Sequence, residues 1–213
     1  MRRTARLAPL AALAVAAALW LPACGGSDEG GATSRAAAPA LADRLPPPGA
    51  LPGLTPGNVV RLPTPGDWVD ALADEGDPAK PAAVRRLRAG GFRGGVLRDE
   101  RRAGAHPILF RTTVARLASA RAARDEAAGS VAGVSRSGDV GTSDVAIPGV
   151  PGSHGTQIAV RAAGRVVRVL FVSFADGPYL YGYQAISLDG GASPRAGVLA
   201  AARAAYERWG GVP

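Results

Sequence analysis

The pattern of apolar and polar positions in the C-terminal third of the chain marks three consecutive β-rich segments, residues 156–161, 165–174 and 179–188. A period of two, together with many β-branched and aromatic residues, is typical of β-strands. Short runs that contain Gly164 and Gly177 separate the segments, and such glycine turns favour antiparallel hairpins. In the middle segment both alternating sets of side chains are apolar. The pattern therefore predicts an antiparallel sheet with the middle segment as a central strand.

Apolar residues at helical spacing, bounded by capping residues and glycines, predict four helices in the rest of the chain. The last of them carries an apolar stripe between Val198 and Trp209. Further strands are expected where β-branched and apolar residues gather earlier in the chain. The helices are expected over residues 68–74, 81–89, 114–128 and 195–209, and the further strands over residues 92–102, 108–114 and 144–147.

Consecutive strands joined by tight turns, with helices between and after them, are typical of an α+β fold. We expect an antiparallel sheet of about four to six strands with the helices packed on it, and we expect this domain over residues 58–213. Residues 24–57 are mainly Gly, Ser, Ala and Pro. Such a segment cannot bury enough apolar surface to fold, so we expect it to be a disordered tether.

The first 23 residues have the parts of a bacterial export signal. Arg2, Arg3 and Arg6 form a basic start, and residues 7–21 form a nearly unbroken apolar run. That run is short for a spanning helix, which needs roughly 20 residues, and fits the core of a signal peptide. We therefore expect a cleavable signal peptide over residues 1–23. A retained membrane helix is the alternative.

The expected signal ends at Cys24, the one cysteine of the chain, so no disulfide can form within the chain. Leu21, Ala23 and Cys24 resemble the bacterial lipobox, although Pro22 departs from the usual Ala, Ser or Thr. The resemblance implies diacylglycerol transfer to the thiol, cleavage before Cys24, and a lipid anchor on the extracytoplasmic side of the cell membrane. Two or three acyl chains anchor a protein stably, whereas one does so only marginally. A plain signal peptide that leaves a free thiol is a second alternative.

The chain carries a formal charge of +8, and its basic residues are almost all arginine. Three of these arginines lie in the expected signal peptide, so the mature chain would carry +5. The others are spread along the sequence and form no basic stripe with interleaved aromatics, which nucleic-acid binding needs. We therefore expect no nucleic-acid partner. A solvated face or an attraction to anionic headgroups accounts for the charge.

Short motifs in the C-terminal part resemble those of actinobacterial cell-envelope lipoproteins. They are a Gly-Phe start at residues 91–92, a Pro-Gly loop at 151–152, and a turn leading into a tyrosine-rich strand at 177–181. The architecture is similar to the Mog1/PsbP-like α/β sandwich. The resemblance implies a non-enzymatic binding or accessory role at the envelope and carries over no catalytic residue.

Two arrangements of residues leave hydrolysis open as an alternative. Ser153 and His154 lie in a loop that is close to the nucleophile elbow of hydrolases, but the loop begins with proline and a β segment follows it. A pair of carboxylates is the basis of glycoside hydrolysis. The carboxylates considered are Asp99, Glu100, Asp125, Glu126, Asp139 and Asp144. The glycine loops lack the spacing of phosphate-binding loops, and we expect no cofactor and no metal.

Tyr179, Tyr181 and Tyr183 occupy alternate positions of the last predicted strand. Side chains two residues apart share a face of a sheet, so the three rings are expected on one face. Tyrosine combines an apolar ring with a hydroxyl, which suits a ligand or partner surface. Packing under a helix, such as the one that carries Tyr206 and Trp209, is the alternative.

Together these features predict a membrane-anchored envelope lipoprotein with a non-catalytic domain that binds a partner protein, an apolar ligand or cell-wall material. One alternative is an envelope hydrolase that uses Ser153 and His154 or a carboxylate pair. Another is an extracytoplasmic sensor or regulatory partner of a membrane protein. The three functions differ in what they require of the tyrosine face and of the loop at Ser153.

Overall fold

The computed structural model describes residues 40–73, 77–104, 106–134, 141–162, 165–188 and 194–210. Cys24, the expected signal peptide and the first part of the expected tether lie outside the described residues, as does Asp139. The described part contains a helix or strand near each one that the sequence pattern predicts, but the strand expected over residues 144–147 lies at residues 141–144. It also contains two elements at its N-terminal side that the pattern did not predict.

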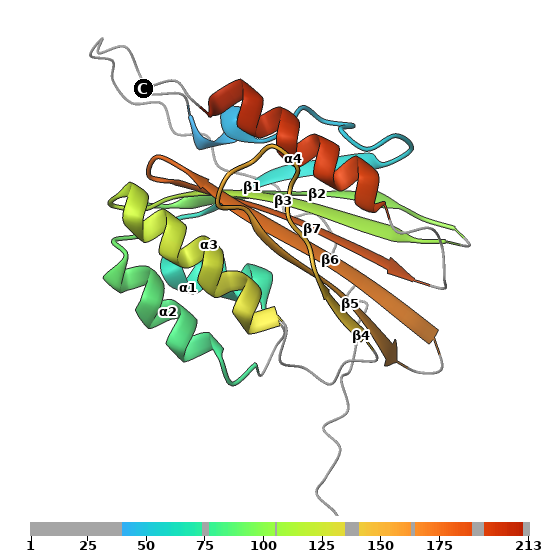
Figure 1. The fold of residues 1–213 in the computed structure, drawn as a ribbon, viewed down its shortest axis with the longest axis horizontal. Helices are drawn as coiled ribbons and strands as arrows, with labels where there is room; N and C mark the ends of the chain where they lie inside the picture. The colour runs from blue at the N-terminus through green and yellow to red at the C-terminus, as the bar shows by residue number, and fades with distance from the viewer. Residues whose placement is uncertain are drawn as a thin grey trace, which may run out of the picture. The chain divides into compact units, whose positions relative to one another are not determined.

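Over the described residues, seven strands form one sheet in which every pair of neighbours is antiparallel. Their order is β1-β2-β3-β7-β6-β5-β4, so two meanders are joined where β3 pairs with β7 (Figure 1). The central position predicted for residues 165–174 is confirmed, because β6 lies between β7 and β5. The strands are β1 (Thr55–Leu62), β2 (Gly95–Arg102), β3 (Ile108–Arg116), β4 (Gly141–Asp144), β5 (His154–Ala162), β6 (Arg165–Asp176) and β7 (Tyr179–Leu188).

β1 is the strand that the sequence pattern missed, and the expected count of four to six strands is therefore too low. It lies at an edge of the sheet, where seven of its eight residues are exposed and only Leu62 is buried. A strand with a single buried residue shows no alternation of apolar and polar positions. Pro56 and Gly57 also give the segment the composition of a linker.

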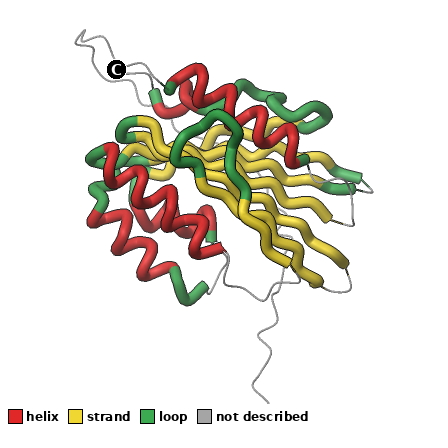
Figure 2. Tube along the Cα trace, viewed as in Figure 1, coloured by secondary structure: helices red, strands yellow, loops and turns green. Residues whose placement is uncertain are grey.

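Helices cover both faces of the sheet. α1 (Pro65–Leu72), α2 (Lys80–Ala89) and α3 (Ala120–Val134) lie on one face, the three-helix face. α4 (Arg195–Trp209) and the short 3-10 helix η1 (Leu41–Arg44) lie on the other, the α4 face (Figure 1, Figure 2). The predicted α+β class, with helices packed on an antiparallel sheet, is confirmed.

The third helix begins and ends later than the sequence pattern predicted. β3 continues to Arg116, and Val114 pairs with Tyr181 of β7 instead of opening a helix. Val114 and its neighbour Ala115 are buried on opposite faces of the strand, and continuous burial hides the period of two. The helix also continues past Gly129, whose missing side chain leaves room for the side chain of Arg86.

Each face of the sheet has its own apolar core. On the α4 face, fully buried Phe174, Tyr181 and Tyr183 lie in one cluster with the inner residues of α4. On the three-helix face, Trp68 of α1 and Leu180 of β7 pack with leucines and with buried alanines of α3. Successive residues of β7 therefore point to different cores, as the period of a strand requires.

The folded domain begins earlier than residue 58, so the expected tether is wrong from residue 40 onward. Leu45 and Leu51 are buried in the core of the α4 face. The backbone between them is also held, because the Pro46 carbonyl accepts a hydrogen bond from Arg98 and Gly49 N donates one to Glu100. The many prolines and glycines of this segment led to its assignment as a tether. Its two buried leucines make their contacts only when the sheet has formed.

Candidate functional site

The tyrosine row lies on the α4 face, with all three rings in or against the same core, as the alternate spacing predicted. Tyr181 and Tyr183 have no exposed surface, and only Tyr179 is partly exposed. Phe174 stacks on Tyr181 with ring centroids 4.7 Å apart, and Tyr206 of α4 meets Phe174 edge-on at 5.8 Å. The proposed ligand surface is therefore wrong for Tyr181 and Tyr183, because α4 covers them.

Arg44 of η1 occupies the end of the tyrosine row. Its guanidinium lies 3.6 Å from the ring centroid of Tyr179 and 5.0 Å from that of Trp209. Its Nη1 donates a 2.7 Å hydrogen bond to the Tyr181 hydroxyl and lies 3.9 Å from Asp176 Oδ2. Two aromatic rings, a hydroxyl and a carboxylate form a site suited to a cation. A side chain of the same molecule fills this site.

The sequence reasoning missed Arg44 because it lies in the segment assigned to the tether. A signal was present, since Leu41 and Leu45 flank it at a spacing that allows one short helical turn to bring both leucines against the core. The structure shows the consequence: η1 packs on the sheet and brings the charge of Arg44 onto Tyr179.

Burial dominates the electrostatics of this region. It raises the pKa of Tyr181 to about 12, although the hydrogen bond from Arg44 acts in the opposite direction. Burial, reinforced by the neighbouring Tyr181, also raises the pKa of Tyr183. Partial burial raises the pKa of the Asp176 carboxyl, and the charge of Arg44 offsets part of that effect. The hydroxyls of Tyr181 and Tyr183 therefore ionise at a higher pH than an ordinary tyrosine hydroxyl does.

We expect two of the four tyrosines to resist ionisation in alkali until the domain unfolds. Their pKa values are raised above the unfolded value of about 10. The resulting stability is present below pH about 10 and is lost as the pH rises through the folded pKa values. Ultraviolet titration of tyrosinate, followed beside circular dichroism, measures this. Tyr183→Phe should remove one tyrosine from the late phase, whereas four tyrosines ionising together in a folded domain would contradict the burial.

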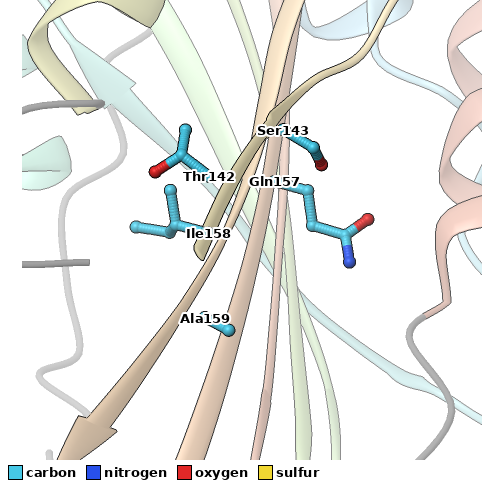
Figure 3. A pocket seen from close by; sticks show the side chains of 5 residues that line it. All are labelled: Thr142, Ser143, Gln157, Ile158 and Ala159. Carbon is cyan, nitrogen blue, oxygen red and sulfur yellow. The ribbon is translucent and has the colours of Figure 1, made fainter. Parts of the chain in front are cut away.

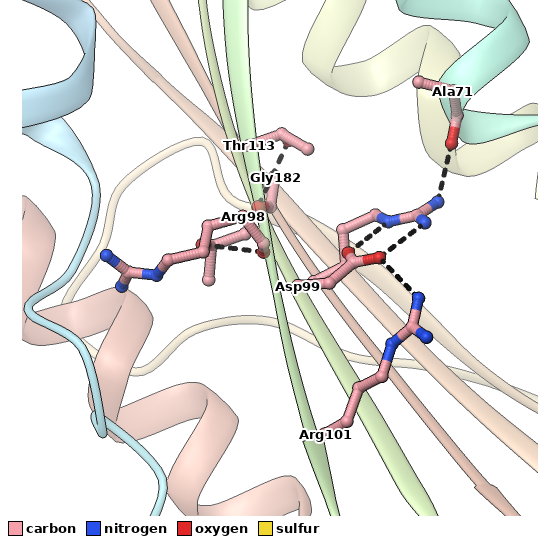
Figure 4. Close-up of polar contacts among 8 residues, drawn as sticks. Ala71, Arg98, Asp99, Arg101, Thr113 and Gly182 are labelled. Carbon is pink, nitrogen blue, oxygen red and sulfur yellow. Dashed lines mark hydrogen bonds and ion pairs between the residues drawn. The ribbon is translucent and has the colours of Figure 1, made fainter. Parts of the chain in front are cut away.

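A second polar cluster is buried on the α4 face, where Arg98 and Glu100 of β2 point inward (Arg98 in Figure 4). Their side chains are 6% and 0% exposed, with Arg98 Nη2 and Glu100 Oε1 3.2 Å apart. They hold the N-terminal segment through the Pro46 carbonyl and the Gly49 amide. The sequence analysis considered Glu100 as a catalytic carboxylate. Its geometry instead makes it the partner of a buried arginine.

Asp99, between these two residues, points to the three-helix face (Figure 4). Its two carboxylate oxygens accept hydrogen bonds from Arg111 at 2.8 and 3.1 Å, and Arg101 lies 3.4 Å away. Arg111 also donates to the Ala71 carbonyl of α1 at 2.7 Å. Arg111, which Asp99 holds in place, thus joins α1 to the sheet.

The remaining candidate carboxylates that the structure describes are the sequence neighbours Asp125 and Glu126, which face different arginines, and Asp144. Asp125 faces Arg121 at 3.7 Å on the exposed side of α3, and Glu126 accepts two hydrogen bonds from Arg86 of α2. Asp144 is exposed at the end of β4. Four of the five candidate carboxylates that lie in the described part of the chain therefore have arginine partners.

Ser153 and His154 are placed by the start of β5. The Ser153 hydroxyl accepts a 2.9 Å hydrogen bond from Ile147 N and closes the loop between β4 and β5. His154 begins β5 and pairs with Ser173 of β6. The nucleophile elbow requires a helix after the serine. Here a strand follows, and the hydroxyl is used to hold the loop.

A shallow hollow of about 250 Å³ lies at the β4 edge of the sheet, lined by Thr142, Ser143, Gln157, Ile158 and Ala159. In Figure 3 the side chains of Thr142 and Ile158 lie on one side of the strands and that of Gln157 on the other. The lining therefore straddles the edge and does not converge on one point. Within the described ranges, no three His, Cys, Asp or Glu side chains gather in a way that could hold a metal ion.

Comparisons with known proteins add one distant likeness. No protein-family model matches the sequence, and no curated protein matches it. The crystal structure of the extracellular domain of PknH from Mycobacterium tuberculosis is similar over 73% of this chain and 84% of that chain, with a TM-score of 0.41 and 12% identity. Similarity at this level establishes neither a common family nor a common activity. The expected resemblance to Mog1/PsbP-like lipoproteins stays a prediction.

A membrane-spanning helix was the first alternative to the lipid anchor. Among the residues that the structure describes, no helix is both long and apolar enough to cross a membrane. The apolar run at residues 7–21 lies outside that part of the chain.

Proposed function

We propose that this chain is a lipoprotein, anchored through Cys24 to the extracytoplasmic side of the cell membrane, whose α+β domain has a non-catalytic binding or accessory role. The observation that carries the proposal is the position of the one cysteine. It follows a basic start and an apolar run, and Leu21 and Ala23 precede it at lipobox spacing.

The small number of residues between Cys24 and the described domain supports an anchored arrangement. The described domain starts at Ala40, 16 residues after Cys24. A chain of that length spans at most about 55 Å when fully extended. The domain would therefore work within a short distance of the lipid surface.

The use of the polar side chains supports a non-catalytic role. Ser153 closes a loop, Glu100 is paired with Arg98, and Arg44 fills the aromatic site at Tyr179. The sequence offered Ser153 and Glu100 for hydrolysis and Tyr179 for ligand binding. In the structure each of the three contributes to holding the domain together.

The direct test is the intact mass of the protein taken from the membrane fraction of its host. We expect a chain that begins at Cys24 and carries acyl groups. We also expect Cys24→Ser to leave the membrane fraction, because the acceptor thiol of the anchor is gone. Pro22→Ala is the matched control, since it brings the box closer to the usual pattern and should keep the anchor. An unmodified chain, or unchanged fractionation of Cys24→Ser, would refute the proposal.

A further inference from the structure

Several connections meet at one end of the sheet, the turn end. Leu117 N donates a 2.9 Å hydrogen bond to the Pro178 carbonyl, which joins the β3–α3 loop to the β6–β7 turn. Ala118 N donates to the Gly90 carbonyl at 3.1 Å and adds the loop after α2. Arg44 of η1 lies against the first residue of β7 and the last residue of α4. Figure 1 shows the β6–β7 turn, the start of α3 and the end of α4 on the same side of the molecule.

The turn end is also where the described domain begins. Ala40 directly precedes η1, and the Ala40 amide donates a 3.0 Å hydrogen bond to Asp43 within it. The segment that leads back to Cys24 is therefore attached at this end. A segment of 16 residues spans at most about 55 Å even when fully extended, so an anchored domain would present this end within that distance of the bilayer.

The exposed side chains of the turn end include more basic than acidic groups. Arg93 N donates a 2.8 Å hydrogen bond to the Arg116 carbonyl, so two arginines lie close together where β3 ends. The exposed arginines of this end are Arg61, Arg88, Arg93, Arg116, Arg121 and Arg208. The carboxylates nearby are Asp43, Asp67, Asp125, Asp176 and Glu207, which face the Ala40 amide, Thr64, Arg121, Arg44 and Arg203. Positive charge is therefore in excess at this surface.

Partly exposed aromatic rings accompany these arginines. Trp209 and Tyr179 flank Arg44, and the Arg208 guanidinium lies 4.9 Å from the Trp209 ring centroid. Tryptophan and tyrosine are enriched at membrane interfaces because one part of each ring is apolar and the other is polar. Arginines around such rings complement the phosphates of lipid headgroups.

We propose that the turn end docks on the anionic headgroups of the membrane to which the chain is anchored. The arginines contact the lipid phosphates, and Trp209 lies at the level of the headgroups. This inference rests on the proposed lipid anchor for its orientation. Docking fixes which surface the domain turns toward the bilayer and leaves the β2–β3 and β5–β6 hairpins facing away from it.

The test separates docking from lipidation by using a chain without an acyl group. Residues 24–213 with Cys24→Ser contain the whole described domain, including both apolar cores, and circular dichroism checks that this chain is folded. Its binding is measured by sedimentation with vesicles of phosphatidylcholine alone and of phosphatidylcholine mixed with phosphatidylglycerol. We expect binding only to the anionic vesicles, and weaker binding at high salt.

Two triple variants with the same change in charge test the place of contact. Arg88→Glu, Arg93→Glu and Arg116→Glu together should weaken binding about a hundredfold or more, because each basic residue near an anionic surface contributes on the order of one kcal/mol. The control variant combines Arg101→Glu, Arg102→Glu and Arg161→Glu. These three arginines are exposed at the opposite end of the sheet. The ends of β6 are about 36 Å apart, several times the screening length of about 8 Å at physiological salt. The control should therefore bind nearly as well as the parent chain.

Three results would overturn the docking surface. They are absence of binding to anionic vesicles, equal binding to both kinds of vesicle, and an equal loss in the two triple variants. None of them depends on acylation of Cys24, which the intact mass tests separately. A failed anchor with intact docking, or the reverse, is thus recognised as such.

Discussion

Glu100→Ala is expected to lower the free energy of unfolding by about 3–5 kcal/mol, because it leaves the charge of Arg98 buried without its partner. The two side chains are almost fully buried, and Glu100 also accepts the hydrogen bond from Gly49 N. The loss of both contacts should loosen the segment around Pro46, whose carbonyl depends on Arg98. Urea unfolding followed by circular dichroism measures the change, and hydrogen exchange of residues 45–51 locates it.

Two variants separate pairing from general loss of charge. Arg98→Met with Glu100→Leu should be more stable than Glu100→Ala alone, since it leaves no charge buried by itself. Asp125→Ala removes a carboxylate from an exposed ion pair whose side chains are 87% and 72% exposed, and it should change stability by less than about 1 kcal/mol. A cost of Glu100→Ala as small as that of Asp125→Ala would contradict the buried pair.

Phe174→Ala is expected to cost about 3–5 kcal/mol of unfolding free energy, the range for removing a buried phenylalanine. Phe174 is 0% exposed and lies at the centre of an aromatic cluster. Its ring is 4.7 Å from that of Tyr181, 6.2 Å from that of Tyr183 and 5.8 Å from that of Tyr206. The substitution would leave a cavity between β6, β7 and α4. Thermal and urea unfolding both report the loss.

The same strand offers a matched control for this substitution. Phe171 is three residues earlier in β6 and points to the three-helix face, where it is only partly buried. Phe171→Ala should therefore cost clearly less than Phe174→Ala. Equal costs would show that Phe174 is not at the centre of the core, and the account of the tyrosine row would then be wrong.

The strands and helices of residues 65–210 follow from local patterns. The alternation in residues 165–174 and 179–188 predicted β6 and β7, and the turn at Gly177 predicted that they pair. The helical spacing up to Trp209 predicted α4. These elements were predictable because their periodicity is the direct result of burying one or both faces of a regular element.

The boundary of the domain was not predictable in the same way. Residues 40–57 have the composition of a linker, yet Leu45 and Leu51 are buried and β1 begins at Thr55. Their partners, β2 and the α4 face, are distant in the sequence. Composition measures the average tendency of a segment to fold, whereas two well-placed leucines and two hydrogen bonds to β2 decide whether this segment does.

The candidate site shows the same division. The sequence by itself determined that Tyr179, Tyr181 and Tyr183 share a face, and that Cys24 is the one cysteine of the chain. Only the tertiary structure decided that Tyr181 and Tyr183 are buried under α4 and that Arg44 lies against Tyr179. The physical reason is that the period of a strand determines which side chains share a face. What covers that face depends on contacts between residues far apart in the chain, such as the hydrogen bond from Arg44 to Tyr181.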